Sequence, residues 1–320
     1  MKILAIQNRM GIGDTVIFLP FIKALSKKYN SPVSLLVKES SKADQYLYET
    51  DYVDKIIILE RDKNHDKRHD GLFGSLNLIK DLKKYNFEKI FIFNSSLRFN
   101  LIAKLSYIPE IFQYPLFKKN KQHITETPKQ FLKDKLNLEI TGDPEIQISK
   151  RLIENSIKNF NINKEEINIL LGIGGSGPTK RIPGETFLNF IEKISKIKKC
   201  RFFLATGKDK DEQAILNLFL NSHLKNLFVP LDNLSIRETL PIIKNCNISI
   251  CNDTGFAHLS AALGIKTITL MADAPLIYGN YSSKMFPIIP DGESSVRHGT
   301  KGKNKINSNK IFSKAIEILG

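Results

Sequence analysis

The chain of 320 residues contains no tryptophan and only three cysteines, Cys200, Cys246 and Cys251. The cysteines do not have metal-site spacing, and an odd number fits a reducing compartment better than a disulfide framework. We therefore expect three buried thiols. The sequence also has no run of about 18 apolar residues, so it predicts no membrane-spanning helix, and it shows no repeat of solenoid length.

A secretory leader is not indicated at the N-terminus either. The first residues, MKILAIQNRMGIGD, carry one lysine and a short apolar run before a glycine and an aspartate. This pattern predicts a first β-strand rather than a signal peptide. We expect a cytoplasmic protein.

Acidic residues are few, since 33 Asp and Glu stand against 48 Lys and Arg, which gives a net charge of +15. The excess is mostly lysine spread along predicted helices, and no RNA-binding signature or recognition helix stands out. We expect no nucleic-acid partner. A basic surface suits an anionic substrate or an anionic membrane face, so it is compatible with peripheral membrane association.

Short apolar runs alternate with amphipathic segments along the whole chain. The runs at 2–8, 31–39, 54–60 and 89–94 predict buried strands, and 14–29 and 74–86 predict helices between them. The pattern then restarts, with strands at 167–175, 200–207, 247–253 and 266–271 and helices at 184–199, 210–222 and 236–246. Such alternation predicts an α/β fold with parallel, doubly wound sheets.

Two domains of ordinary size follow from this restart, 1–155 and 156–320. The polar stretch ENSIKNFNINKEEIN, residues 154–168, is the expected linker, and 307–319 is a last amphipathic helix. Ligands of parallel sheets usually lie beyond the carboxyl ends of the strands. We therefore expect a ligand site in a central cleft between the two domains.

Several short motifs do not meet the requirements of familiar sites. In GIGGSGPTKR, residues 172–181, Pro178 and Thr179 precede Lys180, so a Walker motif is excluded, and GIGD at 11–14 lacks the third glycine of a dinucleotide fingerprint. The acidic run 209–211 is more typical of a first helical turn than of a metal site. The charges of HDKRHD, residues 65–70, favour a solvated loop over a histidine metal pair.

Three clusters remain, each directly after a predicted strand. Asp14 follows the first strand of the first half, and Lys180 and Arg181 follow a glycine-rich turn after the first strand of the second half. The segment 253–258 begins a helix with Asp253, Thr254, Gly255 and His258. Each cluster alone is typical of a cap or a turn. A helix start beside a lysine also suits a phosphate, and the joint placement favours a site.

These motifs resemble glycosyltransferase family 9, the ADP-heptose:lipopolysaccharide heptosyltransferases. The resemblance rests on GIGDTVIFLP, GIGGSGPTKRIP and DTGFAHLSAALG in this order, and on the segment FNSSLRFNLIAKLSYIPEIFQYP. It implies a GT-B fold of two Rossmann-like domains, a first that binds the acceptor and a second that binds the nucleotide sugar. The last helix would then pack back on the first domain. The resemblance also implies an inverting sugar transfer with no cofactor and no metal.

The resemblance also implies roles for individual residues. Asp14 would be the catalytic base, and Lys180 would contact the diphosphate of an ADP-sugar, with Ser176 and Thr179 nearby. Asp211 would meet the ribose hydroxyls, and the main chain at Leu234 would meet adenine. Backbone N–H groups of Thr254 and Gly255 would face the phosphates, with Asp253 and His258 beside them.

The acceptor implied is an anionic, lipid-linked saccharide such as a lipopolysaccharide core, which would place the enzyme at the inner face of the inner membrane. Arg61, Arg68 and Arg98 could meet its phosphates, or they could form a merely solvated basic surface. Ile182 stands where the family usually has tryptophan, so another nucleotide sugar stays open. The alternatives are a nucleotide-sugar epimerase of similar fold and a non-catalytic nucleotide-sugar-binding protein.

Overall fold

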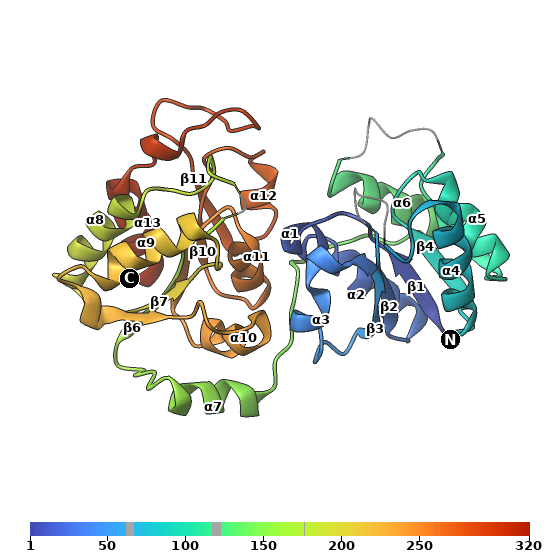
Figure 1. Cartoon of the computed structure of the whole chain (residues 1–320), viewed down its shortest axis with the longest axis horizontal. Helices are drawn as coiled ribbons and strands as arrows, with labels where there is room; N and C mark the ends of the chain where they lie inside the picture. The colour runs from blue at the N-terminus through green and yellow to red at the C-terminus, as the bar shows by residue number, and fades with distance from the viewer. Residues whose placement is uncertain (62–66, 117–122, 176) are drawn as a thin grey trace. The chain divides into compact units, whose positions relative to one another are not determined.

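The computed structural model describes residues 1–61, 67–116, 123–175 and 177–320 (Figure 1). The chain divides into two compact units, Met1–Gln147 and Ile148–Gly320. Each unit consists of one parallel sheet with helices around it and has its own hydrophobic core. The predicted fold class, two doubly wound α/β domains, is confirmed.

The first unit has a five-stranded parallel sheet in the order β3-β2-β1-β4-β5. Its strands are β1 (Ile3–Ile6), β2 (Val33–Lys38), β3 (Val53–Leu59), β4 (Lys89–Ile92) and β5 (Glu110–Gln113). Its helices are α1 (Ile12–Val16), α2 (Leu19–Tyr29), η1 (Glu39–Ser41), α3 (Ala43–Tyr46), α4 (Gly71–Lys83), α5 (Leu97–Leu105) and α6 (Glu126–Leu136). The strand order reverses at β1 and β4, whose carboxyl ends therefore flank the usual ligand position of such sheets.

The second unit has a six-stranded parallel sheet in the order β11-β10-β9-β6-β7-β8. Its strands are β6 (Ile167–Gly172), β7 (Cys200–Ala205), β8 (Phe228–Pro230), β9 (Ile248–Asn252), β10 (Thr267–Leu270) and β11 (Met285–Ile288). Its helices are α7 (Lys150–Asn159), α8 (Gly184–Ser195), α9 (Lys210–Leu220), η3 (Lys225–Leu227), α10 (Ile236–Lys244), α11 (Gly255–Ala262), α12 (Ile277–Asn280), η4 (Lys303–Lys305) and α13 (Ser308–Leu319). Here the order reverses at β6 and β9.

The eight predicted strands are all present, and each contributes buried side chains to its sheet. Strands β5, β8 and β11 were not predicted. The three cysteines are buried, as expected, and burial raises the pKa of each thiol. Across the described residues, no helix has the length and apolarity needed to cross a bilayer.

The predicted helix at 14–29 is two helices, α1 and α2. Pro20 lies in the first turn of α2, where its missing N–H costs no helical hydrogen bond. The same residue in the middle of one continuous helix would remove a bond and clash with the preceding turn. The chain therefore stops one helix at Val16 and begins the next at Leu19.

The expected linker at 154–168 is wrong, because most of it belongs to α7 and to the turn before β6. The side chain of Asn245, at the end of α10, donates to Ser156 Oγ at 2.9 Å and to the Ile153 carbonyl at 3.1 Å. These bonds attach α7 to the second unit. A helix this polar needs such specific bonds because it has little apolar surface to bury.

The last helix, α13, packs within the second unit. Ile311 and Ala315 are fully buried in the core of that unit, and Phe312 and Ile316 pack against it. The resemblance implied packing on the first domain instead. In the structure, the apolar face of α13 packs against α8 and the second sheet.

Candidate functional site

The candidate site lies at the carboxyl ends of β6 and β9, where the second sheet reverses its strand order. Gly172 pairs with Cys251 in register, and a Cβ on Gly172 would lie 2.7 Å from Cys251 Sγ. The Asn252 side-chain amide donates to the carbonyls of Ile173 at 2.9 Å and Gly174 at 3.0 Å. The glycine-rich turn after β6 and the start of α11 after β9 are therefore bound to each other.

Lys180 and Asp253 form an ion pair across this junction. Their Nζ and Oδ2 atoms are 2.5 Å apart, and the side chains are 24% and 5% exposed. The pair brings together two residues that are far apart in sequence but were both predicted as site residues. A cation that remains partly open to solvent beside a buried carboxylate is in place to meet an incoming anion.

His258, on the first turns of α11, extends this polar chain. Its Nε2 is 3.9 Å from Asp253 Oδ1, and its Nδ1 lies 2.8 Å from the Tyr281 hydroxyl. The imidazole also stacks on the Tyr281 ring, with centroids 5.5 Å apart. His258 is thus held on both sides, and it is nearly completely buried.

Thr254 is the N-cap residue of α11, but its side chain makes no capping bond. Its Oγ1 is buried and has no hydrogen-bond partner among the described residues. The turn passes close by, since a Cβ on Gly175 would lie 3.4 Å from Thr254 Cγ2. The start of α11, with Gly255 as its first residue, therefore faces the glycine-rich turn and can offer N–H groups and a positive dipole end to an anion.

Arg181 binds the acidic start of α9. Its Nη1 lies 3.2 Å from Asp209 Oδ1 and 3.1 Å from Asp211 Oδ2. The Asp211 carboxylate is 72% exposed, whereas Arg181 is mostly buried and its Nε has no partner among the described residues. Asp209 is the N-cap of α9, and the N–H of Glu212 that it accepts keeps the pKa of Asp209 below its usual range.

Glu212 is a site residue that the sequence did not reveal. Its Oε1 accepts the Gly175 N–H at 2.6 Å, which holds the glycine-rich turn in place. A Cβ on Gly174 would lie 2.4 Å from Oε1, and one on Gly207 would lie 2.0 Å from Oε2. Burial raises the pKa of Glu212, while the Gly175 hydrogen bond acts in the opposite direction.

Thr179 follows the glycine-rich turn, and its side chain forms a hydrogen bond with Asp273, which lies after β10. Asp273 also accepts the N–H groups of Gly299 and Lys301, both at 2.8 Å. The hydroxyl of Thr179 and these N–H groups keep the pKa of Asp273 below its usual range. The Thr179 hydroxyl thus already has a partner, and Ser176 lies outside the described residues.

Leu234 lies in the turn after β8. Its N–H donates to the Leu231 carbonyl at 3.0 Å, so this turn is closed on itself. Gln213 of α9 donates to the Gly207 carbonyl at 2.9 Å and contacts Asp232 at 3.4 Å. The Leu234 turn is therefore attached to the start of α9, next to the acidic residues that bind Arg181.

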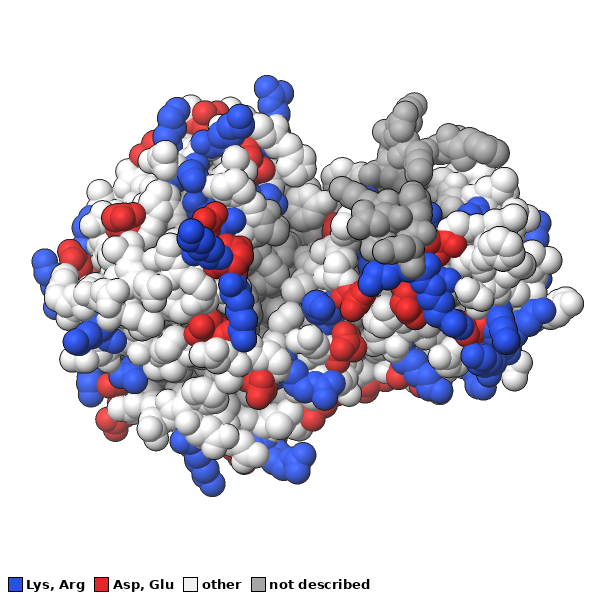
Figure 2. Space-filling view, in the orientation of Figure 1, with Lys and Arg blue, Asp and Glu red and all other residues white. Residues whose placement is uncertain are grey.

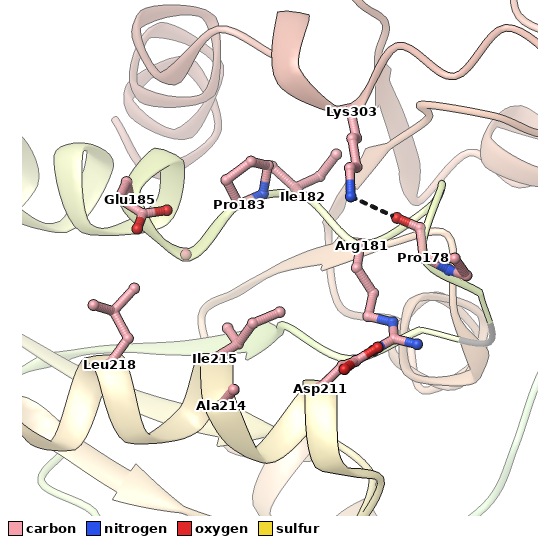
Figure 3. A pocket seen from close by; sticks show the side chains of 11 residues that line it. Pro178, Arg181, Ile182, Pro183, Glu185, Asp211, Ala214, Ile215, Leu218 and Lys303 are labelled. Carbon is pink, nitrogen blue, oxygen red and sulfur yellow. Dashed lines mark hydrogen bonds and ion pairs between the residues drawn. The ribbon is translucent and has the colours of Figure 1, made fainter.

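A cavity of about 500 Å³ adjoins this edge, between the starts of α8 and α9 (Figure 3). One wall is apolar and comes from Ala214, Ile215 and Leu218 of α9. Figure 3 shows the Arg181 guanidinium beside the Asp211 carboxylate at one end of the cavity, and Lys303 bonded to the Pro178 carbonyl. Apolar walls with a few fixed polar groups are typical of small-molecule sites.

In the first unit, Asp14 lies in the first turn of α1, close to the end of β1. Its Oδ2 accepts the Gly11 N–H at 3.0 Å, and its carbonyl accepts the Gln7 side-chain amide at 2.9 Å. Nearby, Asn94 after β4 contacts Asn8 after β1 at 3.4 Å. Asp14 therefore lies at the carboxyl edge where the first sheet reverses its order, and its carboxylate also closes a helical turn.

The three predicted acceptor residues all bind groups of their own unit. Arg68 makes a bidentate pair with Asp81, Arg61 lies 3.3 Å from the buried Asp70, and Arg98 donates to Ser75 Oγ at 2.8 Å and to the His69 carbonyl. The expected solvated loop at 65–70 is wrong at His69, which is 3% exposed and lies 3.2 Å from Asp81. His65 lies outside the described residues.

Lys and Arg do not gather in one dense field on the face shown in Figure 2. Blue side chains are scattered over each unit, with acidic side chains among them. At the candidate site, Lys180 and Arg181 are each paired with carboxylates of the same unit.

The family model described as glycosyltransferase family 9 (heptosyltransferase) matches residues 112–308, more than half of the chain. No curated protein matches the sequence.

Solved structures match over nearly the whole chain. A glycosyl transferase family 9 protein from Veillonella parvula is 16% identical, with a TM-score of 0.81 over 99% of this chain and 97% of that one. The E. coli ADP-heptose lps heptosyltransferase II is 16% identical, with a TM-score of 0.76 over 100% and 98%. The E. coli heptosyltransferase WaaC with ADP is 14% identical, with a TM-score of 0.72 over 99% and 100%. At such identities the matches show the shared GT-B fold.

Proposed function

Because the chain belongs to glycosyltransferase family 9, we propose that it transfers heptose from ADP-heptose to a lipopolysaccharide core or a related anionic, lipid-linked saccharide. The observation that carries the proposal is the junction of β6 and β9. It holds a lysine, a glycine-rich turn and a helix start at the topological switch point of one sheet. This is the arrangement that binds a nucleotide diphosphate in doubly wound sheets.

The donor would bind in the second unit. Lys180 would contact the diphosphate, sharing its charge between the ligand and Asp253, and the N–H groups at Thr254 and Gly255 would meet phosphate oxygens. The buried, unpartnered Thr254 Oγ1 would gain a partner in the complex. Ser176 and Thr179 belong to the same turn, and His258 would hold Asp253 in position.

The nucleoside would extend along the same edge. Asp211 is exposed and could accept both ribose hydroxyls, and the main chain at Leu234 could meet the adenine edge. The contact of Gln213 of α9 with Asp232 in the Leu234 turn supports this placement. The Arg181 side chain would keep Asp211 in a fixed position, since it already binds that carboxylate.

In the transfer, an acceptor hydroxyl oxygen would attack the anomeric carbon from the face opposite the diphosphate. The new carbon–oxygen bond forms as the bond to the diphosphate breaks, which inverts the configuration and releases ADP. Asp14 would take the hydroxyl proton, and Lys180 and the start of α11 would stabilise the charge that develops on the diphosphate. Arg61, Arg68 and Arg98 of the first unit are proposed to lie near the anionic acceptor. We place the reaction in the cytoplasm, at the membrane face where such acceptors would be met.

A thermal-shift panel of ADP-, GDP- and UDP-sugars tests the donor class. Ligands that bind only the native state raise the melting temperature by mass action, so ADP-heptose should give the largest shift. A larger shift with a UDP- or GDP-sugar would contradict the proposed donor.

The Lys180→Ala variant should bind ADP more weakly by about 1.5–3 kcal/mol, the range for a charge-assisted hydrogen bond. The exposed Lys225→Ala is the matched control, and equal ADP affinity in both variants would exclude Lys180 from the site.

A further inference from the structure

Exposed apolar side chains are concentrated on one part of the first unit. Eleven large hydrophobic side chains are exposed among the described residues, and seven of them lie between residues 72 and 107. Three are on α4 (Leu72, Phe73, Leu76), three are on α5 (Leu97, Leu101, Leu105), and the seventh is Tyr107. We call these seven residues the α4–α5 surface.

Their spacing makes one stripe on each helix. Leu97, Leu101 and Leu105 are each one turn apart, and Leu72 and Leu76 are also one turn apart. The opposite faces of the same helices are already buried in the core of the first unit, through Leu78 and Leu82 and through Phe99 and Ile102. A surface helix of a globular protein usually has an apolar face on the core side only. The second stripe on each helix therefore needs an explanation.

The two stripes lie beside each other. Helices α4 and α5 pack together, as Figure 1 shows, and the Lys83 ammonium lies 4.4 Å from the centroid of the Tyr107 ring. Leu72, Phe73 and Leu97 are in the first turns of their helices, near the carboxyl edge of the sheet. The stripes thus form one continuous surface rather than isolated exposed leucines, which are common and carry no meaning.

The charges around this surface are positive. Lys80 and Lys83 continue the α4 stripe toward the end of the helix, and Lys104 is exposed between Leu101 and Leu105. Residues 72–107 contain two acidic residues: Asp81, which is paired with Arg68 and with Lys84, and Glu88, which accepts the N–H of Lys2 at 2.9 Å. An apolar surface with lysines beside it complements a layer that is apolar inside and anionic outside.

We propose that the α4–α5 surface binds an anionic lipid bilayer. The leucines and Phe73 would enter the boundary between headgroups and acyl chains, and the lysines would extend to the phosphates. Tyr107 has the amphipathic ring that favours this boundary. A protein partner is less well matched, because protein interfaces are depleted of lysine, whereas a lipid surface favours it. The proposed function places the reaction at a membrane face, and this inference adds the surface that would bind the membrane. Vesicle binding requires neither donor nor sugar transfer, so the two proposals can fail separately.

Vesicle co-sedimentation of the full chain tests the proposal. The vesicles are phosphatidylcholine alone and phosphatidylcholine mixed with phosphatidylglycerol, each at low and at physiological salt. The variants are Phe73→Ser/Leu101→Ser for the apolar part and Lys80→Gln/Lys104→Gln for the basic part. The matched controls in the second unit are Ile197→Ser, also at an exposed apolar residue, and Lys158→Gln/Lys225→Gln, also at exposed lysines.

The wild type should bind the phosphatidylglycerol vesicles more strongly than the neutral ones, and less strongly as salt rises. Each α4–α5 double variant should lose about tenfold in binding or more, with an unchanged melting temperature, and the controls should bind as the wild type does. Light scattering of the free protein is measured in parallel. Absence of vesicle binding, equal binding by all variants, or self-association that only the apolar variant abolishes would overturn the proposal.

Discussion

At the scale of single residues, the charged side chains of the candidate site already form ion pairs with one another before a ligand binds. Lys180 is held by Asp253, and Arg181 is held by Asp209 and Asp211. Such pairs reduce the number of side-chain conformations that a ligand has to fix, so binding loses less entropy. However, a diphosphate must compete with Asp253 for the ammonium group of Lys180. We therefore expect the site to favour doubly charged ligands over singly charged ones.

Asp14 can act as a cap, as a base or as both, and Asp14→Asn separates these roles. The amide oxygen can still accept the Gly11 N–H, so the melting temperature should stay near that of the wild type. A neutral amide cannot accept the acceptor's proton, so transfer should fall by about 10²–10⁴-fold. The measurement is ADP release in the presence of acceptor. Asp44→Asn, at the first turn of α3, is the matched control.

Donor affinity of Asp14→Asn should be unchanged, because Asp14 belongs to the other unit. If transfer by the variant stayed within a fewfold of the wild type, Asp14 would be a cap only. A large fall in melting temperature would mean that the carboxylate charge itself is needed at the start of α1.

Asp273 gives a pH-dependent prediction. Its pKa is lowered in the folded state by Thr179 and two N–H donors, so its contribution to stability is present above the ordinary carboxyl pKa and is lost as the pH falls toward the folded value. Asp273→Asn should destabilise the protein by about 1–2 kcal/mol at neutral pH. In urea unfolding, this difference should shrink as the pH falls through the ordinary carboxyl pKa toward the lower pKa of the folded state.

Asp134→Asn, on the exposed face of α6, should show neither effect. A stability difference between wild type and Asp273→Asn that stays constant across the acid range would contradict the assignment of the lowered pKa to these donors.

Sequence patterns identified most charged members of the site but not Glu212. Lys180, Asp253 and His258 follow strand ends and are part of recognisable motifs, and the structure brings all three together. Glu212 looked like an ordinary residue of a first helical turn. Only the backbone path explains its burial, because Gly174 and Gly207 leave the space that its carboxylate fills. Gly207, two residues before the acidic run 209–211, is the signal in the sequence that could have pointed to Glu212.

At the scale of elements, α9 supports the glycine-rich turn through that one carboxylate. Glu212 lies in the first turn of α9, yet its bond is to Gly175, in the turn after β6. The strands β6 and β7 are neighbours, so the two turns meet at the same edge. The position of the proposed phosphate site therefore depends on how α9 is seated.

A double-mutant cycle tests this support. Gly207→Ala places a methyl group 2.0 Å from Glu212 Oε2, which should displace the carboxylate and cost about 1–3 kcal/mol of stability. In a Glu212→Ala background the same change should cost little, because the clashing group is absent. Chemical denaturation of the four proteins gives the coupling energy, which should be about 1–3 kcal/mol. Additive effects would show that Gly207 and Glu212 are independent.

The prediction of helices and strands succeeded where the apolar pattern was strong. It failed where a single residue determines where a helix ends or what it packs against. The buried strands β6, β7 and β9 are nearly continuous apolar runs, which is typical of parallel sheets covered on both faces. Pro20 divided one predicted helix into two. The polar sequence at 154–168 predicts a linker where the second half of α7 lies, because the bonds from Asn245 that hold this helix are not visible in any local pattern.

At the scale of the whole molecule, the proposal assigns the donor to one unit and the base to the other. The restart of the strand pattern in the sequence already indicated two sheets, and the structure confirms them. The packing of α7 and α13 could not be predicted from the sequence, because amphipathic helices fit any apolar surface of suitable shape. The structure attaches both helices to the second unit, which extends from Ile148 to Gly320.

The most direct test of the proposed donor site is calorimetric titration of ADP into a fragment of residues 148–320. The fragment keeps α7 and α13 and has a complete sheet and core, so it should unfold cooperatively on its own. Lys180, the glycine-rich turn, Asp211 and the start of α11 all belong to it. We predict that the fragment binds ADP with the affinity of the whole chain to within a fewfold, and that Lys180→Ala weakens both alike. A fragment that melts cooperatively but does not bind ADP, while the whole chain does, would contradict the account.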